Sequence, residues 1–396
     1  MANAILASIV LVIWLYLLAG RGGFWRAAER EDAEGGPATL GAADRLPAVF
    51  AMIPARDEAQ SVGQTVSSLL RQDYTGPFHI VVVDDGSRDG TADVARQAAA
   101  ALGATAKLTV VAGRPLPSGW TGKLWAQHQG VESIEAAGTL PARSKPDYIL
   151  FTDADIVYAP AALSALVRRA QAEGLVLASL MVRLRCQSFA ERLFVPAFVF
   201  FFQMLYPFAW VNDPRRGTAA AAGGCMLVRR DALAAAGGMA AIRAALIDDC
   251  ALGAKLKQQG PISLMLTERV HSIRAYPTIA DIRSMVARTA YAQLGYSPLL
   301  LAGTVLGLAL TYLAPVALTL FAGGLAQFLG LLAWLLMALA FAPILRLYGL
   351  SRLWGLALPA IAAAYLAFTL DSAYQHARGR GGMWKGRAQA NISELR

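Results

Sequence analysis

The chain has 396 residues, of which 56% are hydrophobic and 16% are charged, and its formal net charge is +9 at pH 7. A mean hydropathy of +0.44 excludes an ordinary soluble enzyme, and the length allows a catalytic domain together with membrane segments. The basic balance is typical of cytoplasmic flanks in a membrane protein, and the lack of interleaved basic and aromatic tracts argues against a nucleic-acid partner.

The cysteines and histidines indicate neither a disulfide framework nor a zinc site. Cys186, Cys225 and Cys250 are isolated and odd in number, and the four histidines have no metal-ligand spacing. This pattern favours a reducing compartment. Any metal would therefore be held by carboxylates, whose oxygen atoms favour Mg or Mn over Zn.

The N-terminal segment is apolar. Residues 2–20 carry no charge and have the length of one transmembrane helix, so we predict an N-terminal anchor over residues 1–22. A cleaved signal peptide is the alternative, but no basic residue precedes the apolar run. Arg21 follows the run directly, which favours a cytoplasmic location for the domain that comes next. Residues 26–47 are rich in Ala, Gly and charge and are predicted to form a linker.

Residues 48–155 alternate between strand and helix patterns. Strands are predicted at 48–55, 79–85, 108–113 and 148–151, and helices at 62–72 and 91–102. The strand at 79–85 has no polar face before its end, which is typical of a parallel strand buried on both sides. The alternating order predicts an open α/β sheet of the nucleotide-binding kind.

Two of the predicted strands end on pairs of acids. Asp84 and Asp85 follow the second strand, and Asp153 and Asp155 follow the fourth. Side chains at positions i and i+2 of an extended chain point to the same side, and open α/β sheets bind ligands at the carboxyl ends of their strands. Like charges held close together are costly unless a cation or a proton lies among them. The pattern therefore predicts a site for a divalent metal bound to a diphosphate.

The C-terminal part is again apolar. Three nearly charge-free segments, each long enough to span a bilayer, form a predicted transmembrane region over residues 298–370: 298–321, 325–345 and 353–370. A basic tail follows at 371–396. Three spans would place this tail opposite the catalytic domain, against the positive-inside rule. One segment, with 353–370 and its internal Pro359 as the best candidate, would then be re-entrant or interfacial, and the sequence leaves this open.

Several motifs carry a resemblance to a known family. The motifs are IPARDE (53–58), VVVDDGSRDGT (81–91), GKLWAQHQG (122–130), TDAD (152–155) and IDDCALG (247–253). In this order they resemble those of the family 2 glycosyltransferases with the GT-A fold, over about residues 48–295. The segments PLPSGWTGK (115–123) and MWKGRAQ (383–389) are similar to those of membrane glycosyltransferases associated with hopanoid biosynthesis, which are related to ceramide glucosyltransferase and carotenoid-type enzymes.

The resemblance implies roles in binding a nucleotide-sugar donor. Glu58 and Asp84 would hold the nucleoside, with Pro54 and Asp85 contributed by the same two motifs. In the next motif, Asp153 and Asp155 would contact the ribose and a Mg or Mn ion, and Asp155 is the firmer metal ligand.

Three further residues are assigned by the same resemblance. Lys123 would lie near the donor, although a solvated cation at a helix start is an alternative. Asp249 would be the general base, and Asp248 replaces the usual Glu of its motif or caps the following helix. The family's QxxRW motif is reduced to MVART (285–289), where Arg288 would meet the diphosphate or anchor the chain at the membrane surface.

The segment 189–211 is as apolar as a membrane span. It cannot cross once, because Asp84 precedes it and Asp249 follows it, yet both would serve one site. We expect this segment to lie in the membrane interface or to dip in and return, with breaks at Pro196 and Pro207. A buried core helix is the alternative.

Together these features predict an inverting, metal-dependent glycosyltransferase. It would move a sugar from a nucleotide donor, most simply a UDP-sugar, to a membrane lipid such as a hopanoid or another polyisoprenoid-derived acceptor. The expected place is the bacterial inner membrane, crossed several times, with the catalytic domain in the cytoplasm. The alternatives are a polyprenyl-phosphate sugar synthase, which needs no general base, and a membrane scaffold that has kept the fold without the chemistry.

Overall fold

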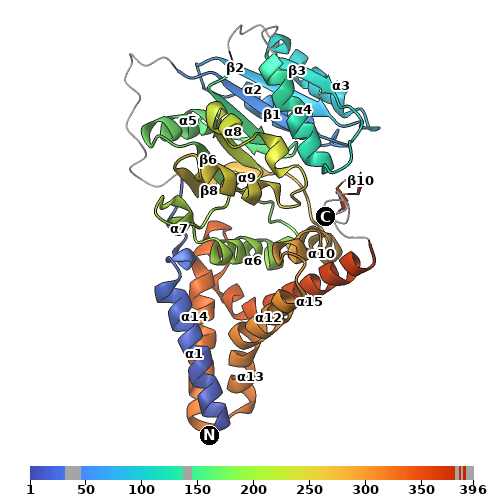
Figure 1. Ribbon diagram of the computed structural model, residues 1–396. Coiled ribbons are helices and arrows are strands. Elements are labelled where there is room, and N and C mark those ends of the chain that lie inside the picture. The colour runs from blue at the N-terminus through green and yellow to red at the C-terminus, as the bar shows by residue number, and fades with distance from the viewer. Residues whose placement is uncertain (32–45, 137–144, 380–382, 385–386, 389–396) are drawn as a thin grey trace. The chain divides into compact units, whose positions relative to one another are not determined.

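The computed structural model describes residues 1–31, 46–136, 145–379, 383–384 and 387–388, which form two compact units (Figure 1). We call Met1–Ala28, Arg185–Ala209 and Ala275–Gly382 the helical unit. The sheet unit contains Glu29–Leu184, Trp210–Arg274 and Met383–Arg396. Most of the predicted linker and part of the predicted basic tail lie outside the described residues.

The sheet unit is built on one eight-stranded sheet with the strand order β3-β2-β1-β4-β7-β6-β8-β5. Its strands are β1 (Val49–Ala55), β2 (Phe78–Asp84), β3 (Leu108–Ala112), β4 (Tyr148–Thr152), β5 (Ile156–Tyr158), β6 (Leu177–Arg183), β7 (Cys225–Arg229) and β8 (Ile262–Ser272). Strands β3, β2, β1 and β4 run parallel, while β7 runs antiparallel to both β4 and β6. The parallel half confirms the predicted open α/β sheet and gathers the carboxyl ends of β1, β2 and β4 at one edge.

The remaining sheet-unit elements connect the strands. The helices are α2 (Val62–Leu70), α3 (Thr91–Ala101), α4 (Gly122–Ala136), α5 (Ala162–Ala172), α8 (Arg230–Ala235) and α9 (Asp248–Lys257), with 3₁₀ turns η2 (Thr105–Lys107) and η3 (Met239–Ile242). A short helix, α7 (Phe208–Asn212), lies at the boundary along the chain between the units. A two-residue pairing joins β9 (Met383–Trp384) to β10 (Arg387–Ala388).

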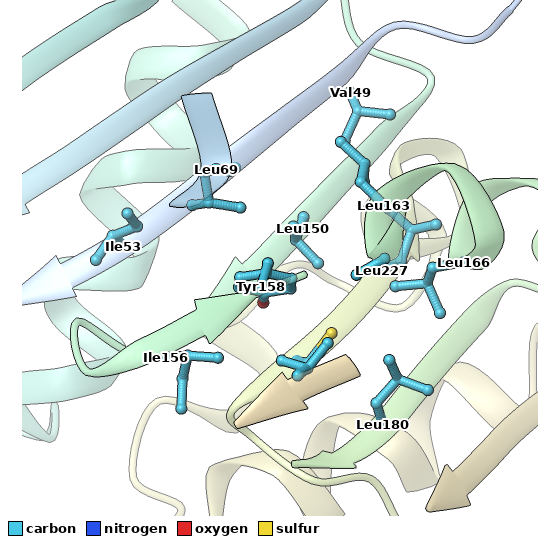
Figure 2. Close-up of a cluster of buried hydrophobic side chains, with 14 of the residues drawn as sticks. Val49, Ile53, Leu69, Leu150, Ile156, Tyr158, Leu163, Leu166, Leu180 and Leu227 are labelled. Carbon is cyan, nitrogen blue, oxygen red and sulfur yellow. The ribbon is translucent and has the colours of Figure 1, made fainter. Parts of the chain in front are cut away.

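The core explains why this sheet forms. Strands β1 and β4 are buried along their whole length, as expected for apolar runs covered on both faces. Figure 2 shows one side of this core, where Leu69 of α2 and Leu163 of α5 pack with Ile53 and Leu150 of the sheet. Helix α4 covers the other face. Each fully buried Leu or Ile contributes roughly 1.5–3 kcal/mol, so the strands are firmly held and their polar ends have fixed positions.

The helical unit is dominated by long apolar helices. Its elements are α1 (Ala2–Gly20), η1 (Phe24–Arg26), α6 (Phe189–Leu205), α10 (Ile279–Ala287), α11 (Ala290–Gln293), α12 (Pro298–Leu308), a π-helical turn η4 (Ala309–Leu313), α13 (Ala314–Phe321), α14 (Gly324–Leu347), η5 (Arg352–Ala357) and α15 (Leu358–Ala377). Among the described residues, four helices are long and apolar enough to cross a membrane: Ala2–Gly20, Pro298–Phe321, Gly324–Leu347 and Arg352–Ala377. These coincide with the four apolar segments of the sequence.

Helix α6 differs from expectation at one proline. The chain stays helical through Pro196 and leaves the helix only at Tyr206, just before Pro207. The predicted break at Pro196 is therefore wrong. The helix is stabilised by a capping box at Ser188 and by ring contacts such as Phe200 with Phe341, whose centroids lie 5.2 Å apart. Such packing outweighs the one hydrogen bond that an internal proline removes.

The π-helical turn η4 interrupts the helix that runs from Pro298 to Phe321. At this turn the indole Nε1 of Trp14 in α1 donates to the backbone carbonyl of Thr311 at 2.8 Å. The Trp14 ring also meets Tyr312 edge to face, with centroids 5.6 Å apart. The first helix is thus joined to the π turn by both a hydrogen bond and an aromatic contact.

The segment after α14 turns back along it. Gly355 of η5 lies so close to α14 that a Cβ atom on it would be 2.7 Å from the Ala338 carbonyl oxygen. Trp334 Nε1 donates to the Leu356 carbonyl at 3.1 Å. Since Ala338 is nine residues before the end of α14, η5 reaches a depth of about 14 Å along that helix.

Helix α15 then returns to the end of the unit at which α14 finishes. The Ser372 hydroxyl accepts from the Tyr291 amide at 3.0 Å and donates to the Ala287 carbonyl. Asp371 also lies 3.7 Å from Arg283. The far end of α15 therefore packs on α10 and α11.

Candidate active site

The sheet unit brings three distant segments together in one cluster of charges. Asp153 follows β4, Asp248 begins α9, and Lys123 lies in the first turn of α4. The Lys123 ammonium nitrogen is 3.0 Å from Asp153 Oδ1 and 3.1 Å from Asp248 Oδ2. One cation thus links the predicted donor-side acid to the predicted catalytic pair.

The environment of Lys123 is not that of a solvated surface residue. Its side chain is 17% exposed. Burial alone would lower its pKa, but the attraction of Asp153, Asp248 and Asp249 outweighs burial and holds the pKa above its ordinary value. The alternative of a solvated cation at a helix start is therefore wrong. Lys123 is a permanent positive charge among the carboxylates.

Asp249 is oriented by two backbone amides. The Gly223 N–H donates to Oδ2 at 2.9 Å, and the Cys250 N–H donates to Oδ1 at 2.7 Å. Burial and the neighbouring Asp248 raise the pKa of Asp249 to about 6, while Lys123 and the two amides oppose them. A carboxylate with this pKa is largely ionised at neutral pH and still basic enough to accept a proton, which suits a general base.

The backbone at Gly223 lies close to the side chains of Asp249 and Lys123, which favours glycine at this position. A Cβ atom at this position would lie 3.3 Å from both Asp249 Oδ2 and Lys123 Nζ. Any larger residue would push one of these groups away. Glycine at this position therefore lets the backbone amide reach the Asp249 carboxylate.

Asp248 does not cap α9. The N-cap position belongs to Ile247, no side chain caps the helix, and Asp248 is the first helical residue. The alternative of a capping role is therefore wrong, and Asp248 faces Lys123 instead. Two adjacent acids in the first turn also interact favourably with the helix dipole.

Asp155 is held by residues that the sequence did not single out. Ser272 Oγ donates to Asp155 Oδ2 at 2.8 Å, and Arg274 Nε donates to the same oxygen at 3.0 Å. The other arm of Arg274, Nη2, donates to Glu58 Oε1 at 2.6 Å. Arg274 thus joins the predicted metal ligand to the predicted nucleoside-binding residue. No local pattern marks an arginine that follows a strand, so only the three-dimensional arrangement identifies it.

The loops after β1 and β2 are bonded to each other. The Glu58 amide donates to Thr91 Oγ1 at 2.8 Å, and the Ala59 amide donates to Asp89 Oδ2 at 2.9 Å. The second half of the DGSRDGT motif is therefore used to fix the position of the first motif. These hydrogen bonds fix the position of the backbone at Glu58.

Asp84 and Asp85 lie where β2 ends. Asp84 accepts from the Ser87 amide at 2.9 Å and so stabilises the turn. Asp85 is almost fully buried, and its Oδ2 lies 3.6 Å from Arg56 Nη1. Pro54 is a buried residue of β1 paired with Val83. These residues line the ends of adjacent strands, as the sequence predicted.

Arg288 belongs to the helical unit, where it is the C-cap residue of α10. All the other predicted site residues belong to the sheet unit. A contact between Arg288 and a diphosphate stays a prediction.

The carboxylates suit a metal that arrives with phosphates. Within the described ranges, no three His, Cys, Asp or Glu side chains are grouped as a protein-only metal site would require. A Mg or Mn ion bound to a nucleotide needs only one or two protein carboxylates, because the phosphates and water supply the other oxygens. Asp153 and Asp155 meet that requirement in number and in ligand chemistry.

Comparison with known proteins gives related enzymes. The chain is 32% identical over 128 residues to the 4,4'-diaponeurosporenoate glycosyltransferase of Staphylococcus aureus, a match that covers 32% of this chain and 29% of that enzyme. Among solved structures, the chain resembles a mannosyltransferase from Pyrobaculum calidifontis in complex with GDP-Man and Mn²⁺. That likeness has a TM-score of 0.52 and 18% identity, and it covers 94% of this chain and 99% of the other.

The structural likeness shows that the α/β domain has the GT-A fold, and apolar helices precede and follow this domain. The profile of one family, described as "Glycosyltransferase like family 2", matches residues 47–290. This match covers more than half of the 396 residues and includes the strand ends, the Lys123 cluster and Asp249. The chain therefore belongs to the family 2 glycosyltransferases.

Proposed function

We propose that this enzyme is an inverting glycosyltransferase that transfers a sugar from a UDP-sugar to a hydroxyl group of a membrane lipid. The observation that carries the proposal is the position of Asp249, which two backbone amides hold beside the Lys123-linked acids of the donor side. Family membership supports nucleotide-sugar chemistry. The Pyrobaculum mannosyltransferase, whose complex contains GDP-Man and Mn²⁺, supports a metal-bound donor.

On the donor side, the proposal assigns nucleoside binding to Glu58, Asp84 and Asp85 with the adjacent Pro54. Asp153 and Asp155 would hold Mg or Mn, and the ion would neutralise the charge of the departing diphosphate. Arg288 is proposed as a further cation for the diphosphate, since a guanidinium binds phosphate oxygens in pairs.

On the acceptor side, Asp249 accepts the proton of the acceptor hydroxyl. The hydroxyl oxygen attacks the anomeric carbon, the bond from that carbon to the diphosphate oxygen breaks, and a nucleoside diphosphate leaves. A single direct attack inverts the anomeric centre. General-base catalysis of this kind is worth about 10²–10⁴-fold in rate.

The helical unit supports a lipid acceptor. Its long helices expose large apolar side chains: Ile5, Ile9, Val12, Leu15, Leu299, Leu300, Leu306, Leu325, Phe328, Leu335 and Leu339. A surface of this kind is stable in hydrocarbon and unfavourable in water. The relative from Staphylococcus aureus is named for a carotenoid acid, itself a polyisoprenoid-derived molecule. We propose a hopanoid or a related polyisoprenoid-derived lipid as the acceptor.

We also propose a membrane arrangement with three crossings and one re-entrant hairpin. Helices α1, α12 to α13, and α14 each cross once. The segment Arg352–Ala377 enters beside α14, turns near Gly355 about 14 Å from the end of that helix, and leaves where Ser372 bonds to Ala287 and Tyr291. It has the hydropathy of a span, but the proposed arrangement puts both of its ends on one side of the membrane.

This arrangement removes the conflict with the positive-inside rule. Arg21 bonds to the Met204 and Leu205 carbonyls, and Gln293 bonds to Tyr206, so the ends of α1 and α6 and the start of α12 lie together. The end of α15 lies at this same end. The basic tail is then on the side where the chain enters the sheet unit, which is the cytoplasm of a bacterial inner membrane.

Reporter fusions test the arrangement. A fluorescent protein fused after residue 379 is expected to fold and fluoresce, whereas alkaline phosphatase fused there is expected to be inactive. The matched control is a fusion in the α13–α14 connection at residue 322, which is expected to give active phosphatase. Active phosphatase after residue 379 would contradict the re-entrant hairpin.

Lipid profiling tests the proposed reaction. A deletion strain and a strain carrying Asp249→Ala are expected to lose the same glycolipid, and that lipid identifies the acceptor class. An Asp249→Asn enzyme with near-normal turnover would contradict a hydroxyl acceptor and favour a phosphate acceptor, which needs no base. A wild-type chain that neither UDP nor GDP stabilises against melting in the presence of Mn²⁺ would contradict an enzymatic role.

A further inference from the structure

Building on the proposed function, we propose that Arg274 competes with the divalent metal for Asp155, so that free metal binds weakly and the metal is taken up with the nucleotide. The Arg274 guanidinium bonds to the carboxylate that the proposed function assigns to the metal. The residue would act as a built-in substitute cation for that site.

The geometry of Arg274 supports competition rather than a distant influence. Its Nε atom donates to Asp155 Oδ2 at 3.0 Å, while Nη2 donates to Glu58 Oε1 at 2.6 Å. The Asp155 side chain is only 8% exposed. A metal binding to the same oxygen must therefore displace the guanidinium or share that oxygen with it.

The chemistry of the groups sets the direction of the effect. A guanidinium stays protonated in proteins, so Arg274 cannot release Asp155 by losing its charge. It holds two carboxylates that would otherwise repel each other. A free metal ion that displaces the Arg274 guanidinium from Asp155 brings no new acceptor for that guanidinium. A metal that arrives with a diphosphate brings oxygen atoms to which the released guanidinium can bond.

Lys123 does not compete for Asp155, although it pairs with Asp153, the other proposed metal ligand. Its ammonium group bonds to Asp153 and Asp248, on the side of the cluster that contains the general base. The two cations thus serve different carboxylates. Removing Arg274 takes the guanidinium away from Asp155 and Glu58 and leaves the Lys123 contacts in place.

Titration of the purified full chain with Mn²⁺ alone, measured by calorimetry or by the spin-resonance signal of free Mn²⁺, tests the proposal without turnover. We expect Arg274→Gln to bind Mn²⁺ at least about tenfold more tightly than the wild type. The matched control is Arg269→Gln, since Arg269 lies in β8, five residues before Arg274, and pairs with Glu31 at 2.9 Å. This control is expected to bind Mn²⁺ like the wild type.

Two further variants keep the test decisive. Arg274→Lys preserves the charge but cannot reach both carboxylates with one planar group, so we expect an intermediate Mn²⁺ affinity even if Arg274→Gln folds poorly. Adding Asp155→Asn to Arg274→Gln is expected to remove the gain. Equal or weaker Mn²⁺ binding in both folded Arg274 variants would overturn the competition. Failure of UDP with Mn²⁺ to bind the wild type would instead overturn the proposed function.

Discussion

Two of the carboxylates in first turns of helices, Glu191 of α6 and Asp249 of α9, have pKa values shifted in opposite directions. Glu191 of α6 is fully buried and accepts from the amides of Gln187, Ser188 and Tyr276 and from Arg185. Burial alone would raise the pKa of Glu191, but these four donors outweigh it and lower the pKa. Asp249 of α9 has two amide donors and an acid as its neighbour, and its pKa is raised to about 6.

The difference separates a structural carboxylate from one suited to chemistry. Glu191 is satisfied by hydrogen bonds, so it fixes the start of α6 and has no tendency to accept a proton near neutral pH. Asp249 is oriented but not fully compensated, because burial and, after it, the charge of Asp248 disfavour the ionised form. A buried carboxylate whose charge is not fully compensated is a candidate for a catalytic role, whereas one satisfied by hydrogen bonds is structural.

The largest effect is expected from Asp249→Asn. Loss of the base should lower turnover by about 10²–10⁴-fold, while the melting temperature at pH 7.5 should fall less than for Glu191→Gln, because the lost repulsion from Asp248 offsets the one amide donor left without a partner. Activity on the lipid acceptor and thermal melting are measured on the same preparation. Asp231→Asn, at the start of α8, is the control and should leave turnover unchanged. A large fall in melting temperature for Asp249→Asn would show that the carboxylate is structural.

The reverse result is expected from Glu191→Gln. An amide group placed against backbone donors leaves at least one of them without a partner, at about 1–3 kcal/mol each. The melting temperature should fall, while turnover at low temperature stays within about threefold of the wild type. Chemical denaturation and low-temperature assays check both parts. Loss of turnover in folded protein would remove the distinction between the two carboxylates.

The pH dependence of activity and that of stability should distinguish Asp249 from Glu191. Asp249 must be ionised to act as a base, so kcat/KM should be constant above its pKa of about 6 and should fall by about tenfold per pH unit below it. The folded-state pKa of Glu191 is lowered, so its contribution to stability is present above its unfolded-state pKa and is lost only at more acidic pH. At pH 5 the enzyme should be folded and slow. A profile without an acidic limb near pH 6 would contradict the base assignment.

A smaller effect is expected from Gly223→Ala. The added methyl group would lie 3.3 Å from Asp249 Oδ2 and Lys123 Nζ, so both groups must shift by a few tenths of an ångström. We expect turnover to fall by roughly tenfold, as for a slightly misplaced catalytic group, with little change in KM for the donor. Gly217→Ala, where a Cβ atom has no neighbour within 4 Å, is the control. Unchanged turnover in Gly223→Ala would show that the close approach is not needed.

Sequence patterns predicted the strand ends well because the signal there is local. Apolar runs that end on acids identify the carboxyl edge of a parallel sheet, so Asp84 and Asp155 were found without a structure. Arg274 was missed because its partners, Glu58 and Asp155, come from two other strand ends. Asp248 is a similar case. The local sequence allows it to cap α9, but its actual partner, Lys123, lies far away in the sequence.

The helices show the same limit. Their apolar segments were readily identified from length and charge. The passage of α6 through Pro196 depends on neighbouring rings, and the reversal near Gly355 depends on the close approach of two backbones. Neither is visible in a window of sequence. Tertiary contacts decided what local preference left open.

The bond between Trp14 and the π turn has a consequence for the first helix. Pro315, four residues after Thr311, has no N–H to donate to the Thr311 carbonyl as a regular helix would, and hydrocarbon offers no other donor. Trp14 supplies the missing hydrogen to Thr311. An arbitrary apolar helix of equal length could anchor the protein in a bilayer, but it would not donate a hydrogen bond to the Thr311 carbonyl. The first helix is thus an integral part of the fold. Replacing it with a foreign anchor should destabilise the helix around Thr311, 297 residues further along the chain.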